Sequence, residues 1–274
     1  MLDKVNIAVV GATGAVGEVM LDILADRMVP AKNVYPLASE RSLGKQVNFG
    51  NTTIAVDDLA TFDFSKVQIG LFSAGASVSE IYAVKAAETG CVVIDNTSQF
   101  RYQKDIPLVI SEVNPEKIAD HVNTGIIANP NCSTMQMLVA LKPIHDAVGI
   151  TRINVATYQA VSGAGKKALE DLVHQTSALL NGRPVKLEGK NKQIAFNAVP
   201  QIDSFQDNRY TKEEMKMVWE TQKIFDDETI MVNPTAVRIP VFYGHSEAVH
   251  IETKLKITQD EVVNLMKKAP GIKL

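Results

Sequence analysis

Short apolar runs alternate with amphipathic stretches along the first 130 residues of the chain. The runs predict β-strands at residues 5–10, 33–39, 67–74, 91–96, 108–114 and 125–130. Apolar residues recur at helical spacing over residues 15–28, and a second helix is predicted over 77–90, with Ser77 or Ser79 as N-cap and Gly90 as its stop. Strands that alternate with helices are typical of a Rossmann-like α/β fold with a doubly wound parallel sheet.

The pattern changes from about residue 151. The later apparent strands, at residues 153–161, 193–200, 236–243 and 248–257, are longer and alternate between apolar and polar positions. Alternation is typical of antiparallel strands with one covered face. Helices are predicted at residues 166–182, 212–225 and 259–269. We therefore predict two domains, 1–132 with the parallel sheet and 133–274 as an α+β domain with a mainly antiparallel sheet.

Composition narrows the function classes. The 274 residues carry a net charge of -3, with 46% hydrophobic and 22% charged residues, which is typical of a globular protein and gives no reason to expect nucleic acid or an anionic membrane as partner. The first apolar run is too short for a signal peptide or a membrane span. Two cysteines are too few for a disulfide framework, and no Cys or His pair has zinc-site spacing. We expect a cytoplasmic protein with free thiols and no metal site.

A glycine loop follows the first predicted strand. Gly11, Gly14 and Gly17 stand between that strand and the opening of a helix. Glycines there let the backbone approach a pyrophosphate, whose charge is favoured at a helix N-terminus. The alternative is a turn that binds nothing. The sequence argues against a nucleoside triphosphate loop, because no Lys-Ser or Lys-Thr follows the last glycine.

The end of the second predicted strand bears on the choice of dinucleotide. Ser39, Arg41 and Ser42 surround a single acidic residue, Glu40. An acidic residue at this place favours NAD, whereas arginine and hydroxyl groups suit the extra phosphate of NADP. The pattern favours NADP and leaves use of both cofactors open. The alternative for Arg41 is a solvated loop charge.

The two cysteines have different settings. Cys132 follows an Asn-Pro-Asn turn and stands at the predicted start of a helix, where the helix dipole favours a thiolate. Cys91 begins an apolar strand, where a free cysteine usually behaves as a small hydrophobe. We predict that Cys132 is a nucleophile and Cys91 a core residue. An inert thiol at the helix start is the alternative for Cys132.

Eight motifs then carry a family resemblance that runs in order along nearly the whole chain: GATGAVG, SAG at 73–75, DNTSQFR, PNCST, TYQAVSGAG, AFNAVPQID, EEMKMVWETQKI and VRIPVFYGHSEAV. As a set they resemble the bacterial aspartate-β-semialdehyde dehydrogenases. The resemblance implies reversible, NADP-dependent reduction of β-aspartyl phosphate to aspartate β-semialdehyde and phosphate, in biosynthesis of lysine, threonine, methionine and diaminopimelate. It implies an NADP-binding first domain and a catalytic, dimerising second domain.

The resemblance also assigns roles to residues. Cys132 is implied as the nucleophile that forms a thioester, His245 as the acid–base group and Gln159 as the side chain that orients the acyl group. Arg238 is implied to hold the α-carboxylate, Glu220 to meet the ammonium, and Lys223 and Arg101 to hold phosphate beside Asn131. The alternative for Glu220 and Lys223 is an exposed ion pair three residues apart on a helix, and for Arg101 a loop charge. The cofactor residues are implied to be Gly11, Thr13, Gly14, Ala15, Val16, Gly17, Ser39, Arg41, Ser42, Ser73, Ala74, Gly75, Ser162 and Gly163.

The same family resemblance leaves two alternative functions open. One is a catalytically silent NADP-binding homologue, because family members continue beyond Leu274 with a segment that returns to the nucleotide domain. Without that segment we expect an apolar face of the nucleotide domain to be uncovered. The other rival is an N-acetylglutamyl-phosphate reductase, against which Glu220 argues, since an acetylated amine carries no charge. A homodimer formed through the sheet of the second domain is expected from the family.

Overall fold

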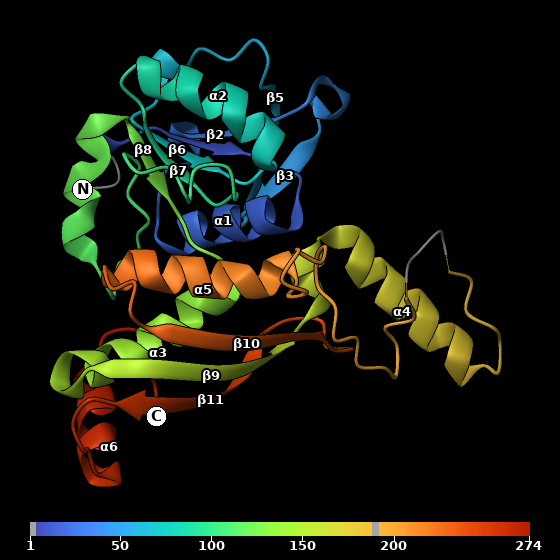
Figure 1. Cartoon of the computed structure of the whole chain (residues 1–274). Coiled ribbons are helices and arrows are strands. Elements are labelled where there is room, and N and C mark those ends of the chain that lie inside the picture. Colours follow the sequence, from blue (N-terminus) through green and yellow to red (C-terminus); the bar gives the residue numbers. More distant parts are fainter. Residues whose placement is uncertain (1–3, 188–191) are drawn as a thin grey trace. The chain divides into compact units, whose positions relative to one another are not determined.

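The computed structural model describes residues 4–187 and 192–274 (Figure 1). The chain forms two compact units. The first comprises Met1–Val109 and Pro115–Pro130, and the second comprises Ile110–Asn114 and Asn131–Leu274. The short stretch 110–114 and Cys132 thus belong to the second unit, whereas the sequence placed both in the first domain.

The first unit contains an all-parallel six-stranded sheet in the order β5-β2-β1-β6-β7-β8. Its strands are β1 (Ile7–Val10), β2 (Val34–Ala38), β5 (Asp57–Asp58), β6 (Ile69–Phe72), β7 (Val92–Asp95) and β8 (Ile126–Ala128). A separate hairpin pairs β3 (Gln46–Phe49) with β4 (Thr52–Ala55). Helices α1 (Ala15–Asp26) and α2 (Ala76–Glu88) lie on opposite faces of the sheet (Figure 1). This is the predicted doubly wound arrangement.

One face of this sheet is covered only in part. Ile7 and Val9 are buried against α1, but their neighbours on the same face, such as Leu71 and Ile94, are only half-buried. The opposite face is sealed, since Phe72 and Val93 are completely buried. Parallel sheets normally have both faces covered, so the side of β6 and β7 next to α1 is an apolar surface that is open among the described residues.

Two predictions for the first 130 residues were wrong in detail. Residues 108–114 form no strand, because Asn114 Oδ1 accepts a hydrogen bond from Ile110 N at 2.9 Å and closes a turn there. The N-cap of α2 is Gly75, with φ 94°, and neither serine caps the helix. Ser79 instead donates a hydrogen bond to Asp95 at 2.9 Å inside the core.

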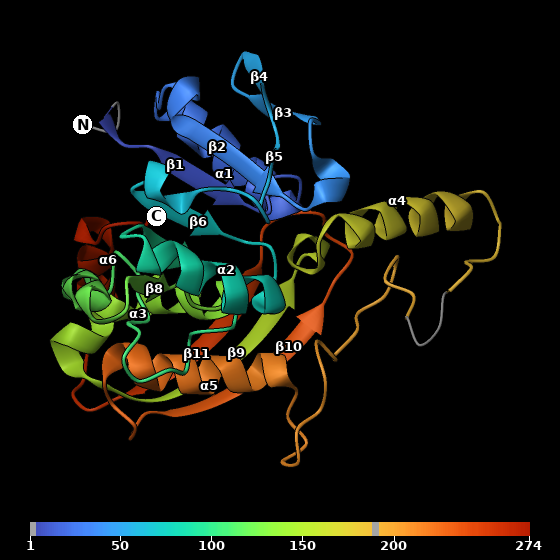
Figure 2. The ribbon, with the colours of Figure 1, turned by 90° about the horizontal axis from the view of Figure 1, so that it is seen from above.

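The second unit contains a three-stranded sheet in the order β10-β9-β11 (Figure 2). Its strands are β9 (Ile150–Gln159), β10 (Met231–Arg238) and β11 (Ser246–Thr253), and its helices are α3 (Cys132–Val148), α4 (Lys166–Leu180), α5 (Lys212–Phe225) and α6 (Gln259–Lys268). β9 pairs antiparallel with β11 but parallel with β10, so the sheet is mixed. Crossing from β9 to a parallel β10 requires the long helical connection that contains α4 and α5.

Residues 193–200 do not form the predicted strand. The backbone N–H groups of Ile194 and Ala195 donate to the side chain of Gln175 in α4, at 2.8 and 3.2 Å. Only Val199 pairs with the sheet, as an isolated bridge to Arg238. A glutamine from the preceding helix thus replaces the partner strand that the alternating pattern seemed to require.

Helices α3 and α5 lie on one face of the second sheet (Figure 1). Inward-facing residues of β9, such as Ile153 and Val155, are buried there, while the alternating Tyr158 and its neighbours face outward. Helix α5 begins at a capping box, in which Thr211 and Glu214 satisfy each other's backbone N–H groups. Among the residues described, no helix is long and apolar enough to cross a membrane.

Candidate active site

Cys132 is the first residue of α3, and its side chain is exposed. The N-cap, Asn131, accepts hydrogen bonds through Oδ1 from Ser133 N at 3.0 Å and from Thr134 N at 3.4 Å. The side chain of Asn131 therefore satisfies two of the donors that a helix start leaves unpaired. The predicted helix-start position of the thiol is confirmed.

His245 lies against this thiol. Its Nε2 is 3.2 Å from Cys132 Sγ, and its Nδ1 is 3.0 Å from Ala160 N. A backbone N–H can only donate, so Nδ1 accepts and the proton of the neutral ring lies on Nε2, facing the sulfur. Burial lowers the pKa of His245, the charge of Arg238 lowers it further, and the charge of Glu213 opposes them in part. The ring is thus set up to be neutral near pH 7 with its single N–H directed at sulfur.

The mixed sheet brings three predicted residues to one edge. Gln159 and Arg238 are register partners at the ends of the parallel strands β9 and β10. His245 directly precedes β11, whose first residue, Ser246, pairs with Tyr158. Because β11 runs antiparallel to β9, its beginning lies where β9 ends. Side chains that are far apart in sequence therefore meet beside Cys132.

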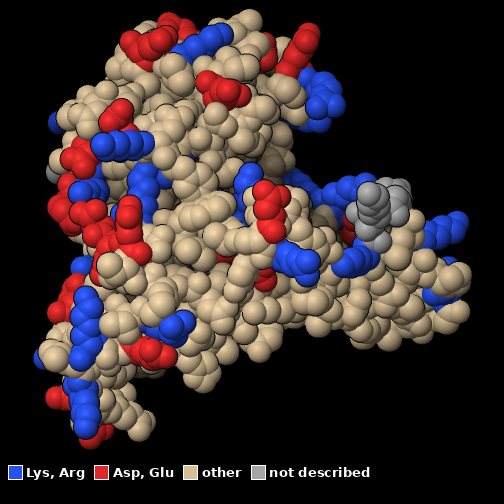
Figure 3. Space-filling view, viewed as in Figure 1, with Lys and Arg blue, Asp and Glu red and all other residues tan. Residues whose placement is uncertain are grey.

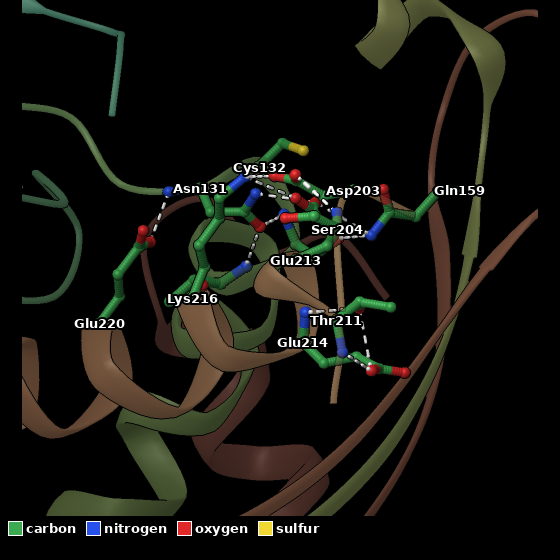
Figure 4. A network of polar contacts seen from close by, with 12 residues as sticks. Asn131, Cys132, Gln159, Asp203, Ser204, Thr211, Glu213, Glu214, Lys216 and Glu220 are labelled. Atoms are coloured by element: carbon green, nitrogen blue, oxygen red, sulfur yellow. Dashed lines mark hydrogen bonds and ion pairs between the residues drawn. The ribbon is translucent and has the colours of Figure 1, made fainter. Parts of the chain in front are cut away.

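Gln159 and Asn131 converge on a buried carboxylate (Figure 4). Glu213 Oε1 accepts from Asn131 Nδ2 at 2.9 Å and from Gln159 Nε2 at 3.3 Å. Gln159 Nε2 also lies 3.0 Å from Ser133 Oγ and 3.2 Å from Thr157 Oγ1. Both amides are therefore fixed by contacts within the protein.

Glu220 and Lys223 do not form an exposed pair on a helix surface. Glu220 is completely buried, and its Oε2 accepts from Asn131 N at 2.6 Å. Lys223 is half-buried, and burial lowers its pKa, while the charge of Glu220 opposes that shift. The structure thus places the Glu220 carboxylate against the backbone of the turn that precedes the thiol.

Arg238 is held toward the same edge. Its Nη1 donates to Ala160 O at 2.6 Å. The guanidinium also borders a cavity of about 400 Å³ in the second unit, which is lined by Lys186, Lys192 and Asp203 as well. Lys and Arg side chains are prominent on the visible surface of α4 and the segment after it (Figure 3). Asp171 lines this cavity too, so its charged lining is mixed.

The glycine loop of the first unit forms a second cavity, of about 560 Å³. Gly11 has φ 89°, and a Cβ at this position would come within 2.8 Å of Ser73 O. A Cβ at Gly17 would come within 2.2 Å of Gly11 O. These positions require glycine, and they form the close turn that a pyrophosphate needs. The lining fits a dinucleotide.

The predicted cofactor residues divide between the units. Gly11, Thr13, Gly14, Ser39, Arg41, Ser73 and Ala74 line the cavity of the first unit. Ala15, Val16 and Gly17 form the first turn of α1. Ser42 and Gly75 do not line that cavity. Ser162 and Gly163 belong to the second unit, where a Cβ at Gly163 would lie 3.5 Å from His245 Nε2.

Arg101 lies in the first unit, and it is not a solvated loop charge. Its side chain is buried, with Nε donating to Thr97 O at 2.9 Å and Nη2 donating to Asn96 O at 3.0 Å. Cys91, in the same unit, is only 1% exposed, and burial raises its pKa to about 11. The core assignment of Cys91 is confirmed. In the ranges 4–187 and 192–274, no group of His, Cys, Asp and Glu could hold a metal ion.

The sequence reasoning missed Glu213, Lys216, Asp203 and the backbone of Ala160. Lys216 Nζ lies 2.9 Å from Glu213 Oε2 and 3.3 Å from Asp203 Oδ2. The spacing of Glu213 and Lys216, three residues apart on a helix, was a visible signal. That this helix face points inward toward Asn131 was not visible.

Two family models match the chain. The model described as "Semialdehyde dehydrogenase, NAD binding domain" matches residues 6–121, and "Semialdehyde dehydrogenase, dimerisation domain" matches residues 141–274. The first unit contains the dinucleotide-type loop, and the second contains the thiol–imidazole pair. Together with these features, the two family models define a nicotinamide-dependent oxidoreductase of the semialdehyde dehydrogenase class.

Relatives then specify the family. An aspartate-semialdehyde dehydrogenase of Legionella pneumophila is 62% identical over 272 residues, which cover 99% of this chain and 78% of the relative, and that of Bacillus subtilis is 49% identical over 98% and 80%. The crystal structure of aspartate semialdehyde dehydrogenase II of Vibrio cholerae, complexed with ASA, is 60% identical and superimposes with a TM-score of 0.95 over 98% of this chain and 80% of that one. The chain belongs to the aspartate-semialdehyde dehydrogenase family.

We expect His245 to titrate below its ordinary pKa of 6.5. A proton on Nδ1 would face the N–H of Ala160, so protonation breaks that hydrogen bond in addition to charging a buried ring. As pH falls through the lowered pKa, activity that needs the neutral ring is lost. Carbon-13 histidine NMR measures the midpoint, with His245→Gln identifying the signal. A midpoint at or above 6.5 would contradict the assignment.

Proposed function

We propose that this chain catalyses the reversible, NADP-dependent reduction of β-aspartyl phosphate to aspartate β-semialdehyde and phosphate, through a thioester on Cys132. The observation that carries the proposal is the pairing of Cys132 Sγ, at a helix start, with His245 Nε2 at 3.2 Å. The family to which the chain belongs supports the substrate assignment.

The first step is attack of the Cys132 thiolate on the acyl carbon. Nε2–H of His245 donates to the sulfur, and the α3 N-terminus adds a favourable electrostatic field, so both stabilise the anionic nucleophile. The new C–S bond forms as the C–O bond to phosphate breaks, and phosphate leaves with that electron pair. A covalent intermediate of this kind divides one difficult step into two easier ones.

In the second step the oxyanion that forms at the acyl carbon needs a hydrogen-bond donor. The bound cofactor supplies the hydride for this step. His245 supplies the donor, because its one N–H can turn from sulfur to the oxyanion beside it. Collapse of the hemithioacetal oxyanion releases the aldehyde and returns the thiolate. In these steps His245 acts from Nε2 as a hydrogen-bond donor, while Ala160 N keeps Nδ1 occupied. We propose that the same Nε2 also serves as the acid–base group when the thiol and the thiolate interconvert.

Charged side chains hold the substrate in this proposal. Arg238 pairs with the α-carboxylate, since a guanidinium binds a carboxylate through two parallel hydrogen bonds. Glu220, buried against the Asn131 backbone, meets the ammonium group. Lys223 of the second unit binds the phosphate, with Asn131 in the same unit. Arg101 of the first unit is also proposed as a phosphate-binding residue. The buried carboxylate at Glu220 favours an amino group with a positive charge over an acetylated one.

Cofactor choice rests on the loop after β2. Arg41 and Ser39 line the cavity of the first unit and suit the additional phosphate of NADP. Glu40 lines the same cavity, so the loop offers one carboxylate beside one guanidinium. The guanidinium favours NADP.

Loss of catalysis on removal of the thiol tests the reaction. Incubation with NADP, aspartate semialdehyde and phosphate should produce nicotinamide absorbance, and omission of phosphate should abolish it. We expect Cys132→Ala to reduce kcat by roughly 10³-fold or more, because the covalent route is lost. The matched control, Cys91→Ala, should retain kcat, since Cys91 is a buried core residue of the first unit. A wild-type chain without turnover, or an active Cys132→Ala variant, contradicts the proposal.

A substitution at Arg41 tests the preference for NADP. Arg41→Ala should raise the KM for NADP by about tenfold, which is the order expected for loss of a charge-assisted hydrogen bond, and should change the KM for NAD far less. Lys45→Ala, which removes an exposed charge nearby but outside the cavity lining, is the control. Equal effects of Arg41→Ala on both cofactors would contradict NADP preference.

A homodimer is supported by the outward face of the second sheet. Tyr158 and Ala248 are exposed there, and the dimerisation family model covers these strands. Sedimentation equilibrium should give twice the chain mass of 29.9 kDa. Ala248→Arg should shift the protein toward monomer by placing a charge on this face, while Ala119→Arg in the first unit should not. A wild-type monomer would contradict the dimer.

A further inference from the structure

Helix α3 packs along strand β11, and the thiol–imidazole pair lies where this packing begins. The inward side chains of β11 are those at positions 247, 249 and 251, since the positions between them are exposed. Positions at intervals of four from Cys132 line one cavity of about 330 Å³ together with these inward residues: Gln136, Ala140 and Ile144 on α3, and Glu247, Val249 and Ile251 on β11. Four helix residues advance about 6 Å and two strand residues about 6.8 Å, so each turn of α3 meets the next inward position of β11.

The next contact in this series, between Gln136 and Glu247, is polar. The Gln136 side chain forms a hydrogen bond with the Glu247 carboxyl group. The other residues that line the cavity, such as Met137, Leu141 and Met266, are apolar. Glu247 Oε1 is buried, and no group in residues 4–187 and 192–274 forms a hydrogen bond with it. The position of this carboxyl group therefore depends on its bond to Gln136.

Glu247 stabilises the fold poorly. Burial raises its pKa to about 7, and the hydrogen bond from Gln136 opposes that shift only in part. The described groups that face the carboxyl carry no charge: Gln136 and Met137 of α3, Thr157 of β9 and Met266 of α6. The titratable groups next in line are Cys132, one turn earlier on α3, and His245, two positions earlier in the chain. An acid that is partly buried among uncharged groups is unfavourable for folding, so stability does not explain its presence.

A hydrogen bond restricts the helix in a way that apolar contacts do not. Burial of apolar surface is non-directional, so Ala140 and Ile144 would tolerate a small shift or rotation of α3 against β11. The bond between Gln136 and Glu247 forms in one register only, because it needs its donor and acceptor within about 3.2 Å of each other. Polar residues in the apolar interfaces of coiled coils fix the register of their helices in the same way.

We propose that Glu247, through its hydrogen bond with Gln136, is a positioning residue that sets the register of α3 along β11. Gln136 is one turn from Cys132, and Glu247 is two positions from His245, so this register determines how closely Sγ and Nε2 approach each other. Glu247 acts through these two groups and not on the reacting atoms. The proposal rests on the function proposed above, which gives the pair of Cys132 and His245 its role in catalysis.

Glu247→Leu is the direct test, because leucine has a similar size and cannot accept the hydrogen bond from Gln136. We expect kcat to fall tenfold or more, within the roughly 100-fold loss that small misplacements cause, while KM changes less than about threefold. The Cys132 thiolate also loses its contact with the N–H of His245, so alkylation by iodoacetamide should need a higher pH. The midpoint of that pH dependence should move toward the midpoint of His245→Ala.

The melting temperature separates a loss of positioning from a loss of structure. The pKa of Glu247 in the folded protein, about 7, is above the ordinary value of 4.5, so the wild type loses stability as pH rises from 4.5 through 7. Leucine carries no charge, and Glu247→Leu should therefore melt at or above the wild-type temperature, with a larger gain at pH 8 than at pH 5. A fall of kcat in a protein that is at least as stable as wild type is not the result of unfolding.

Further variants test the bond itself. Glu247→Gln keeps an acceptor for Gln136 and should restore kcat to within about threefold of wild type. Gln136→Leu should reproduce the loss, and the Gln136→Leu/Glu247→Leu double variant should lose no more than either single variant, because each removes the same bond. Ile251→Val, further along the same face of β11, is the matched control, which should lower the melting temperature and keep kcat within about twofold of wild type.

The outcomes distinguish this inference from the function beneath it. If the wild-type chain has no turnover, the proposed function fails, and the alkylation midpoints still test the register. If the wild type turns over, the positioning role is overturned when Glu247→Leu keeps the wild-type kcat or alkylation midpoint, or when Glu247→Gln is as impaired as Glu247→Leu. It is also overturned if Glu247→Leu raises the midpoint further in the His245→Ala background, because Glu247 would then act on the thiol without His245.

Discussion

The turn that presents Cys132 is held by buried carboxylates from a single helix. Glu220 accepts from the backbone N–H of Asn131 at 2.6 Å, and Glu213 accepts from its side chain at 2.9 Å. Both acids come from α5, so the place where α3 begins depends on how α5 is seated. Removal of water from two carboxylates is unfavourable by several kcal/mol. The two carboxylates remain buried only because each accepts hydrogen bonds from strong donors. The position of the nucleophile is therefore coupled to the electrostatics of a neighbouring helix rather than to its own turn alone.

The parts of the fold that depend on local chemistry followed from the sequence. The glycine loop, the helix that starts at Cys132 and the bounds of α5 were visible because glycine, helix-capping residues and apolar spacing act over a few residues. The error at residues 193–200 came from a partner outside that segment. Residues 193–200 look like a strand, but Gln175 takes their backbone donors. A strand pattern shows that the backbone N–H groups need acceptors. It does not show which group provides those acceptors.

The candidate site divides in the same way. Cys132 and the glycine loop had physical signatures in the sequence, whereas His245 could be chosen among five histidines only through the family resemblance. The structure supplies the missing reason, because Ala160 N fixes the tautomer and the sheet directs Nε2 to the sulfur. Glu213 gave only a spacing to Lys216, which on an exposed helix would indicate a weak surface pair. Burial converts that ordinary spacing into a fixed charge at the site.

The mixed sheet also limits how the chain can vary. Gln159, Arg238 and His245 reach one edge only because β9 and β10 keep their register and β11 starts opposite the end of β9. A one-residue shift turns each side chain of a strand to the other face. Insertions or deletions inside these three strands would therefore abolish catalysis before they prevented the chain from folding. Length changes are tolerable in the loops at the opposite edge of the sheet, where no residue of the thiol site lies.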